Sequence, residues 1–166
     1  MTPCTIIIPA HDESAYIDGC LDNLLAQDYA GPVEVIVVAN GCQDDTADRA
    51  RARTDDFARR GWSLRVEELA QGGKIGALNH GDACAGPGIR CYLDADLRMA
   101  PRLLSRMIEV LDVPEPRYAG GRLVVAPAKS WVSRRYGRFW QTLPFVARTV
   151  TAVSYTHLRA HETRGN

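Results

Sequence analysis

The chain of 166 residues is long enough for one domain with a buried core, and its composition, 46% hydrophobic and 24% charged, is that of a globular protein. Twenty basic residues balance twenty acidic ones, which argues against a general nucleic-acid-binding surface. The five cysteines form no C-x-x-C pair, so neither a disulfide framework nor a zinc site is indicated, and no apolar run is long enough to cross a bilayer. With no signal segment at the N-terminus, these features predict a cytoplasmic domain with buried, reduced thiols.

In the first half of the chain, apolar β-branched runs alternate with amphipathic segments. In chain order we expect a strand at 5–9, a helix from about 14 with apolar residues at helical spacing to 25, a strand at 33–39 and a helix from 44 to about 60. Asn40-Gly41 predicts a turn between the second strand and its helix. Acidic residues begin that helix and Arg59-Arg60 ends it, which is the order that the helix dipole favours.

The alternation continues in the second half. In chain order we expect a strand at 62–69, a loop at 71–73, a helix at 74–84, a strand at 89–93, a helix from 101 to 111, a strand at 117–125 and an aromatic, Arg-rich helix at 131–143. Strands that alternate with helices are connected by right-handed crossovers, which makes them parallel and covers both faces of the sheet. The sequence therefore predicts an α/β fold with one doubly wound domain.

Asp94-Ala95-Asp96 places two carboxylates one residue apart at the end of the predicted strand 89–93. In an extended chain such residues point to the same side, and Ala95 between them is too small to block a ligand. Carboxylate oxygens suit Mg²⁺ or Mn²⁺ shared with substrate phosphates, and ligands of open α/β sheets bind at the carboxyl ends of strands. The motif therefore indicates a metal–diphosphate site, with a turn or a helix cap as the alternative.

Together with three earlier segments, this motif resembles the family 2 glycosyltransferases of the GT-A fold. The four segments, in the order and spacing of that family, are Pro-Ala-His-Asp-Glu at 9–13, Ala-Asn-Gly-Cys-Gln-Asp-Asp-Thr at 39–46, Gly-Lys-Ile-Gly-Ala-Leu-Asn at 73–79 and Asp-Ala-Asp at 94–96. Two positions depart from the family pattern. His11 stands where an aromatic ring packs on the nucleotide base, and Asn40 replaces an Asp that accepts a hydrogen bond from the base, which puts a uridine preference in doubt.

The resemblance implies a Rossmann-like GT-A fold, with a mostly parallel sheet and helices on both faces, that binds a nucleotide-diphosphate sugar with Mn²⁺ or Mg²⁺. The residues it implies for donor binding are Pro9, His11, Glu13, Asn40, Lys74 and Asp94, and those for the metal are Asp94 and Asp96. Each position also has a purely structural interpretation. Residues 11–13 would cap the first helix, Asn40-Gly41 would serve only the turn, and Lys74 would be a solvated loop residue.

The implied reaction is glycosyl transfer, in which an acceptor hydroxyl attacks the anomeric carbon and a nucleoside diphosphate leaves. Inverting members of the family use a carboxylate general base downstream of the Asp-x-Asp segment, and no segment here matches it. Residues 153–166 resemble a translated transposase adaptor from shotgun sequencing, so the metal-like pair His157 and His161 is set aside. We therefore expect residues 1–152 to be the N-terminal part of a single glycosyltransferase domain, incomplete at the C-terminus, without a catalytic base and inactive by itself.

Other functions remain open at this point. A sugar nucleotidyltransferase would need a Gly-rich loop after the first strand, and residues 9–13 contain no glycine. A haloacid-dehalogenase-type phosphatase would place its Asp-x-Asp after the first strand, and a nucleotide-binding module without turnover is the non-enzymatic alternative. The acceptor, a saccharide or a lipid, is not identified. The helix 131–143 either covers the sheet or makes peripheral membrane contact, in which case a cytoplasmic protein would lie at the inner face of the membrane.

Overall fold

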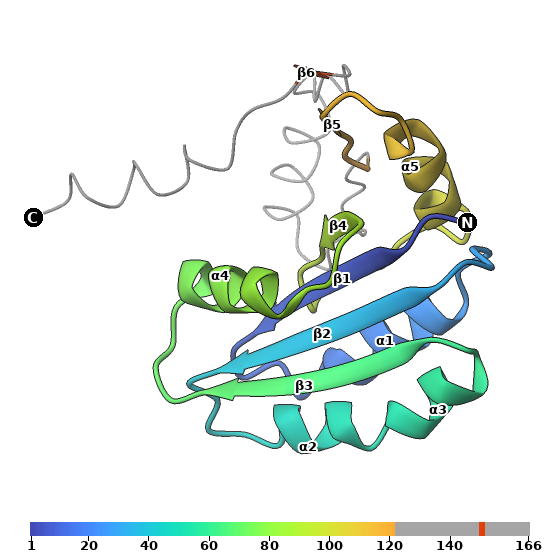
Figure 1. Cartoon of the computed structure of the whole chain (residues 1–166). Coiled ribbons are helices and arrows are strands. Elements are labelled where there is room, and N and C mark those ends of the chain that lie inside the picture. The colour runs from blue at the N-terminus through green and yellow to red at the C-terminus, as the bar shows by residue number, and fades with distance from the viewer. Residues whose placement is uncertain (122–149, 152–166) are drawn as a thin grey trace, which may run out of the picture. The chain divides into compact units, whose positions relative to one another are not determined.

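The computed structural model describes residues 1–121 and 150–151 of the chain. These residues divide into two units, residues 1–112 and the described residues from 113 onward. The first unit contains a four-stranded parallel sheet (Figure 1). Its strands, in the spatial order β3-β2-β1-β4, are β1 (Cys4–Ala10), β2 (Val33–Asn40), β3 (Ser63–Leu69) and β4 (Ile89–Tyr92). The chain moves outward from β1 to β3 and then returns to the other side of β1. Crevices outside the carboxyl ends of the strands form at such a reversal.

Helices cover both faces of this sheet, as the sequence predicts (Figure 1). They are α1 (Ile17–Leu25), α2 (Thr46–Arg51), α3 (Thr54–Arg59), α4 (Lys74–Cys84) and α5 (Leu103–Leu111). Because side chains alternate along a strand, Ile6 and Ile8 of β1 join the larger hydrophobic cluster, which includes residues of α1, α3 and α5. On the opposite face, Ile36 and Val38 of β2 pack against Ala77 of α4. Both faces of the central strands are therefore dry, which explains their nearly continuous apolar sequences.

The single helix predicted for 44–60 is two helices, α2 and α3. The hydroxyl of Thr54 donates to the carbonyl oxygen of Arg51 at 2.8 Å, so a side chain competes with the helical hydrogen-bond pattern at this point. The guanidinium of Arg53 bonds both Asp22 and Asp56, which anchors the junction to the neighbouring helix α1. Helical periodicity runs through both helices without interruption, so the break left no signal in the hydrophobic pattern.

The second unit contains β5 (Arg117–Tyr118), which pairs antiparallel with β6 (Val150–Thr151). The strand predicted for 117–125 is thus only two residues long within the described part of the chain. Residues 119–121 are described and are not part of a strand, whereas residues 122–125, the predicted helix 131–143 and the proposed tail at 153–166 lie outside the described residues. None of the described helices has both the length and the apolar character needed for a membrane span.

All five cysteines are free, but only Cys4, Cys20 and Cys91 are buried. Burial raises the pKa of the Cys4 and Cys20 thiols to about 12 and that of Cys91 to about 11, so these three behave as small core residues. Cys42 and Cys84 are half-buried, which corrects the expectation that all the thiols are buried.

Candidate functional site

A pocket of about 420 Å³ opens at the carboxyl ends of β1, β2 and β4. It is lined by Pro9, His11, Glu13, Asn40, Gly73, Lys74, Asp94, Ala95 and Asp96. Every residue that the sequence singled out for donor or metal binding is on this surface. The pocket also includes Gly73 and Ala95, which were not singled out, because a small residue in a motif has no side-chain chemistry to mark it.

Backbone geometry places the loop after β1 against the loop after β2. The His11 imidazole contacts the backbone oxygen of Asn40, with Nδ1 at 2.6 Å. Because a carbonyl oxygen only accepts, Nδ1 carries the proton, and the ring is held at the pocket wall by this bond. Asp12 adopts a left-handed φ of 52°, which Asp tolerates better than most residues, and its carboxylate accepts the Gln43 N–H at 2.7 Å.

A second set of bonds locks the same two loops. The hydroxyl of Thr46, which is fully buried, accepts the Glu13 N–H at 2.8 Å and donates to the Asp44 carboxylate. That carboxylate also accepts the Ser14 N–H at 3.1 Å. The hydrogen bond from Thr46 is the main cause that lowers the pKa of Asp44 below its usual range. Desolvation opposes this shift, and the hydrogen bond with Ser14 adds to the lowering. Asp44 and Thr46 therefore support the pocket from behind, a role that sequence reasoning did not assign to them.

Asn40 is buried at the end of β2. Both the NH₂ group and the oxygen of its side-chain amide form hydrogen bonds with backbone groups. Its NH₂ donates to the Ala10 oxygen at 2.8 Å, and its side-chain oxygen accepts the Gly73 N–H at 2.8 Å. The next residue, Gly41, has a positive φ of 63°, and a Cβ there would lie 2.6 Å from the Gly72 nitrogen. The turn predicted at Asn40-Gly41 is confirmed. The Asn40 side chain also connects β1, β2 and the loop that precedes α4.

Asp94 and Asp96 lie in a tight turn, not in the extended chain expected from their spacing. The Leu97 N–H donates to the Asp94 oxygen at 3.0 Å, and β4 already ends at Tyr92. Ala95 is buried while Asp96 is exposed, so the turn directs the small residue inward and leaves both acidic residues on the pocket surface. The extended geometry was wrong, and both carboxylates line the same pocket.

Lys74 is the first residue of α4, and its ammonium lies 2.6 Å from an Asp94 carboxylate oxygen. Both side chains are about half exposed, so the pair is solvated and contributes at most about 1 kcal/mol to stability. A lysine held this weakly is available to another anion in the same pocket. Lys74 is thus a solvated residue at the pocket wall, and it lies at the start of a helix and not in a loop.

The lining residues carry an excess of negative charge, because the three carboxylates of Glu13, Asp94 and Asp96 face one ammonium. Desolvation raises the pKa of Glu13 first, and the nearby charges of Asp96, Asp44 and Asp94 raise it further. Oxygen donors with uncompensated charge fit a hard divalent cation such as Mn²⁺ or Mg²⁺. The residues present are therefore suited to such an ion at Asp94 and Asp96.

The alternative structural roles for residues 11–13 receive little support. Helix α1 begins at Ile17 without a side-chain cap, and it is the backbone oxygen of Glu13 that accepts the N–H groups of Tyr16 and Ile17, both at 2.9 Å. The side chains of His11 and Glu13 therefore do not cap the helix, and both line the pocket.

Comparisons with known proteins agree with this architecture. Among curated proteins, the chain is 30% identical over 105 residues to the uncharacterized glycosyltransferase EpsJ of Bacillus subtilis, covering 63% of this chain and 29% of that protein. It is 28% identical over 137 residues to the glycosyltransferase AglE of Haloferax volcanii, covering 81% of this chain and 44% of that protein. The chain therefore spans less than half the length of these relatives.

Solved structures with this fold include the mannosyltransferase PcManGT from Pyrobaculum calidifontis in complex with GDP-Man and Mn²⁺. It has a TM-score of 0.62 and 30% identity, over 69% of this chain and 33% of that one. TarS of S. aureus, residues 1–349, has a TM-score of 0.58 and 23% identity, over 66% of this chain and 32% of that one, which shows the shared fold alone.

The described unit is thus a GT-A fold, as the resemblance implied. The model of glycosyl transferase family 2 matches residues 5–164, almost the whole chain. Order, spacing and pocket geometry agree with this match, and the chain belongs to glycosyl transferase family 2.

Proposed function

We propose that the protein of which this chain is part transfers a sugar from a nucleotide-diphosphate donor to an acceptor hydroxyl, with a divalent metal in the donor site. The observation that supports this is the pocket itself, where residues from four separate segments of the chain meet at the carboxyl ends of three strands. The family assignment supports the transferase over the sugar nucleotidyltransferase alternative. PcManGT, whose structure holds GDP-Man and Mn²⁺, is a related precedent for this class of donor and metal.

In this proposal, the pocket residues divide into a nucleoside end and a phosphate end. His11, whose ring is held by the Asn40 backbone oxygen, stacks on the base, with Pro9 beside it at the end of β1. Glu13 lies near the ribose. Asn40 fixes the shape of the nucleoside end of the pocket through its hydrogen bonds to Ala10 and Gly73. The nucleotide base is therefore recognised by the hydrogen-bonding positions of Asn40 that remain and by the backbone around this residue.

The phosphate end consists of Lys74, Asp94 and Asp96. Asp94 and Asp96 would hold Mn²⁺ or Mg²⁺, which when bound neutralises the charge of the diphosphate leaving group. Lys74 exchanges its half-exposed partner Asp94 for a phosphate oxygen, at a cost of no more than about 1 kcal/mol. It then supplies a fixed positive charge where negative charge develops as the glycosidic bond to the diphosphate breaks.

Binding and turnover are separable in this proposal. The described pocket residues serve the donor, and we assign no general base among them. We propose a saccharide or a lipid as the acceptor. We also propose peripheral membrane contact through residues 131–143, which the structure does not describe. A module that binds the donor without turnover would show the same binding and no product.

Isothermal titration of the chain with GDP and with UDP, each with and without Mn²⁺, tests the donor site. We expect binding of at least one nucleotide that depends on Mn²⁺ and is lost in Asp96→Asn. Asp55→Asn, which neutralises an exposed carboxylate on α3 away from the pocket, is the matched control and should bind like the wild type. Binding that is unchanged in Asp96→Asn, or a folded wild type that binds neither nucleotide, would refute the proposal.

A further inference from the structure

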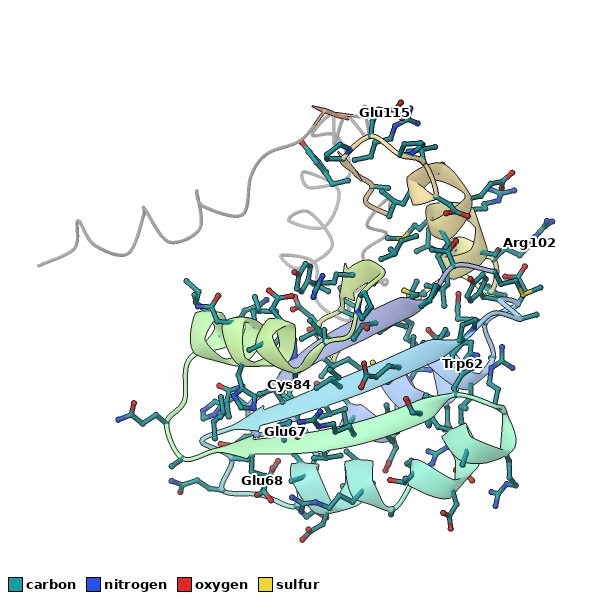
Figure 2. All side chains as sticks on the ribbon, viewed as in Figure 1. Trp62, Glu67, Glu68, Cys84, Arg102 and Glu115 are labelled. Atoms are coloured by element: carbon teal, nitrogen blue, oxygen red, sulfur yellow. The ribbon has the colours of Figure 1, made fainter. Side chains whose placement is uncertain are left out.

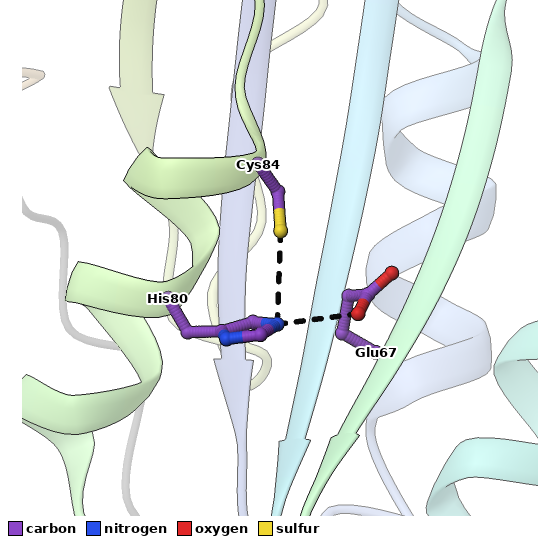
Figure 3. Close-up of side chains that lie close together, drawn as sticks. All are labelled: Glu67, His80 and Cys84. Atoms are coloured by element: carbon purple, nitrogen blue, oxygen red, sulfur yellow. Dashed lines mark hydrogen bonds and ion pairs between the residues drawn. The ribbon is translucent and has the colours of Figure 1, made fainter.

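Three side chains with different donor atoms converge between α4 and β3, outside the pocket (Figure 3). They are Glu67 of β3 and His80 and Cys84 of α4, and one ligand atom from each lies within 4.8 Å of the others. We propose that Glu67, His80 and Cys84 form a binding site for a divalent transition-metal ion of the Zn²⁺ type. This site is independent of the proposed donor site.

The contacts of Glu67 and Cys84 with His80 meet at the same ring nitrogen. The Nε2 atom of His80 lies 3.2 Å from Glu67 Oε2 and 3.6 Å from Cys84 Sγ, and the two dashed lines in Figure 3 end on that atom. Zinc binds its ligands at about 2.0 to 2.3 Å in a tetrahedron, which puts neighbouring donor atoms about 3.3 to 3.6 Å apart. The two spacings at Nε2 are therefore already close to those of a metal site. The third pair, a Glu67 carboxylate oxygen and Cys84 Sγ, lies within 4.8 Å and would adjust when the ion binds.

The same geometry argues against a nucleophilic triad. In a triad the acid bonds one ring nitrogen and the nucleophile bonds the other, so that the histidine relays a proton between them. Here the Glu67 carboxylate and the Cys84 sulfur face the same nitrogen, which has only one proton to give or one lone pair to donate. The carboxylate and the sulfur thus gather around the third donor atom, as ligands of a shared cation do.

The kinds of atom decide which cation fits. An imidazole nitrogen, a thiol sulfur and one carboxylate oxygen suit Zn²⁺ and its neighbours in the transition series, whereas Mg²⁺ and Ca²⁺ prefer oxygen alone. The proposed donor-site ligands, Asp94 and Asp96, offer only oxygen, so the two sites would select different metals. With three protein ligands, the fourth position of a tetrahedron is left for water or another ligand.

Regular structure holds the three ligands in place. His80 and Cys84 are four residues apart on α4 and therefore share one face of the helix. Glu67 and Glu68 are neighbours on β3 whose side chains face opposite sides of the sheet: Glu68 pairs with Arg51 of α2, and Glu67 with His80 of α4 (Figure 2). Only one of the two glutamates can therefore reach the helical pair.

Arg65, two residues before Glu67 on β3, orients the carboxylate. Its Nε donates to Glu67 Oε1 at 2.5 Å, which leaves Oε2 for the site. A guanidinium nitrogen of Arg65 also lies 3.5 Å from Cys84 Sγ, a long contact that a bound ion would replace.

The ligands are reachable from solvent, since the side chains of His80 and Glu67 are 35% and 25% exposed. A bound ion would tie the C-terminal half of α4 to β3. The other group of potential ligands among the described residues, Asp12, Cys42 and Asp44, has its carboxylates occupied by backbone N–H groups of the two pocket loops. Cys42 therefore provides a matched control, because it is the other half-buried thiol.

Titration of the full chain with Co²⁺, a spectroscopic substitute for Zn²⁺, tests the proposal. A thiolate ligand gives a charge-transfer band that oxygen-only sites such as Asp94 and Asp96 do not produce. We expect one equivalent of Co²⁺ to produce this band, Zn²⁺ to remove it by displacement, and Cys42→Ser to retain it. Cys84→Ser should abolish the band, and His80→Ala should weaken the affinity at least about 10-fold, the smallest loss usual even for outer-shell partners.

The titration of the wild type can refute the proposal by itself. A folded chain that gives no thiolate band with Co²⁺ overturns it. A band that persists in Cys84→Ser, or that disappears in Cys42→Ser, would place the metal elsewhere and overturn it too. Should Cys84→Ser fail to fold, X-ray absorption at the zinc edge of the loaded wild type replaces it. One sulfur neighbour with nitrogen and oxygen supports the site, and a shell without sulfur refutes it.

Discussion

Replacing Asn40 by Ala removes a side chain whose two ends join three parts of the fold. The NH₂ group donates to the oxygen of Ala10, a buried residue of β1 that also pairs with β2 in the sheet. Because the sheet pairing remains, losing this bond costs about 0.5 to 1.5 kcal/mol. The lost bond to Gly73, where water can replace the partner, adds about 0.5 to 1.5 kcal/mol. We therefore expect Asn40→Ala to lower the free energy of unfolding by about 2 kcal/mol.

Urea denaturation followed by circular dichroism measures this change, with the slope against urea checked for constancy so that the midpoint reports stability. The control is Asn79→Ala, which removes an exposed Asn of α4 and should change stability by less than about 0.5 kcal/mol. A decrease of less than about 1 kcal/mol in Asn40→Ala, at an unchanged slope, would refute the assignment of its amide to the architecture of the pocket. The same variant should bind nucleotide less tightly, because the loop before Lys74 loses its attachment.

Three further predictions follow from single contacts. Lys74→Ala should change the free energy of unfolding by less than about 1 kcal/mol, since its ion pair is solvated, but should weaken nucleoside diphosphate binding about tenfold in calorimetry, with a smaller effect on a nucleoside monophosphate. Gly81→Ala should destabilise the protein by about 1 to 2 kcal/mol in urea denaturation, because the new Cβ would clash with Ile7 Cγ2. The control Gly76→Ala, whose new Cβ would have no neighbour within 4 Å, should stabilise α4 by about 0.5 to 1 kcal/mol. Equal effects of the two substitutions would contradict the packing of α4 on β1. Asp44→Asn should be less stable than the wild type at neutral pH, because the lowered pKa of Asp44 means that its ionised form stabilises the fold. In denaturation curves this difference in stability should shrink as the pH falls below 3.8, the ordinary pKa of an Asp carboxyl. A difference in stability that does not depend on pH would refute the role of the ionised carboxylate.

Much of the fold follows from local patterns. Apolar runs such as 33–39 mark strands that are buried on both faces, and the helical spacing from Ile17 to Leu25 marks the buried side of α1, because both signals repeat over a few residues. The break between α2 and α3 did not follow, since it rests on the Thr54 hydroxyl and on the Arg53 ion pairs. A hydrophobic pattern does not record such side-chain bonds.

The same division applies to the pocket. The family resemblance brought Lys74 into one predicted site with Asp94 and Asp96, and strand-end geometry alone had indicated the two carboxylates. The extended geometry assumed for Asp94 and Asp96 was wrong, since a turn closes on Leu97. Chain order places residues near an edge of a sheet, but the backbone angles that aim them depend on hydrogen bonds formed only in the folded chain.

The sequence by itself determined the family, the parallel α/β architecture and the residues of the candidate donor pocket. Only the tertiary structure showed that the Asn40 amide connects the pocket loops by hydrogen bonds and that Glu67 lies close to His80 and Cys84. The physical reason is one of distance along the chain. Periodicity and short motifs report interactions between neighbouring residues, whereas the position of Glu67 against α4 depends on strand register and helix packing, which the whole domain sets together.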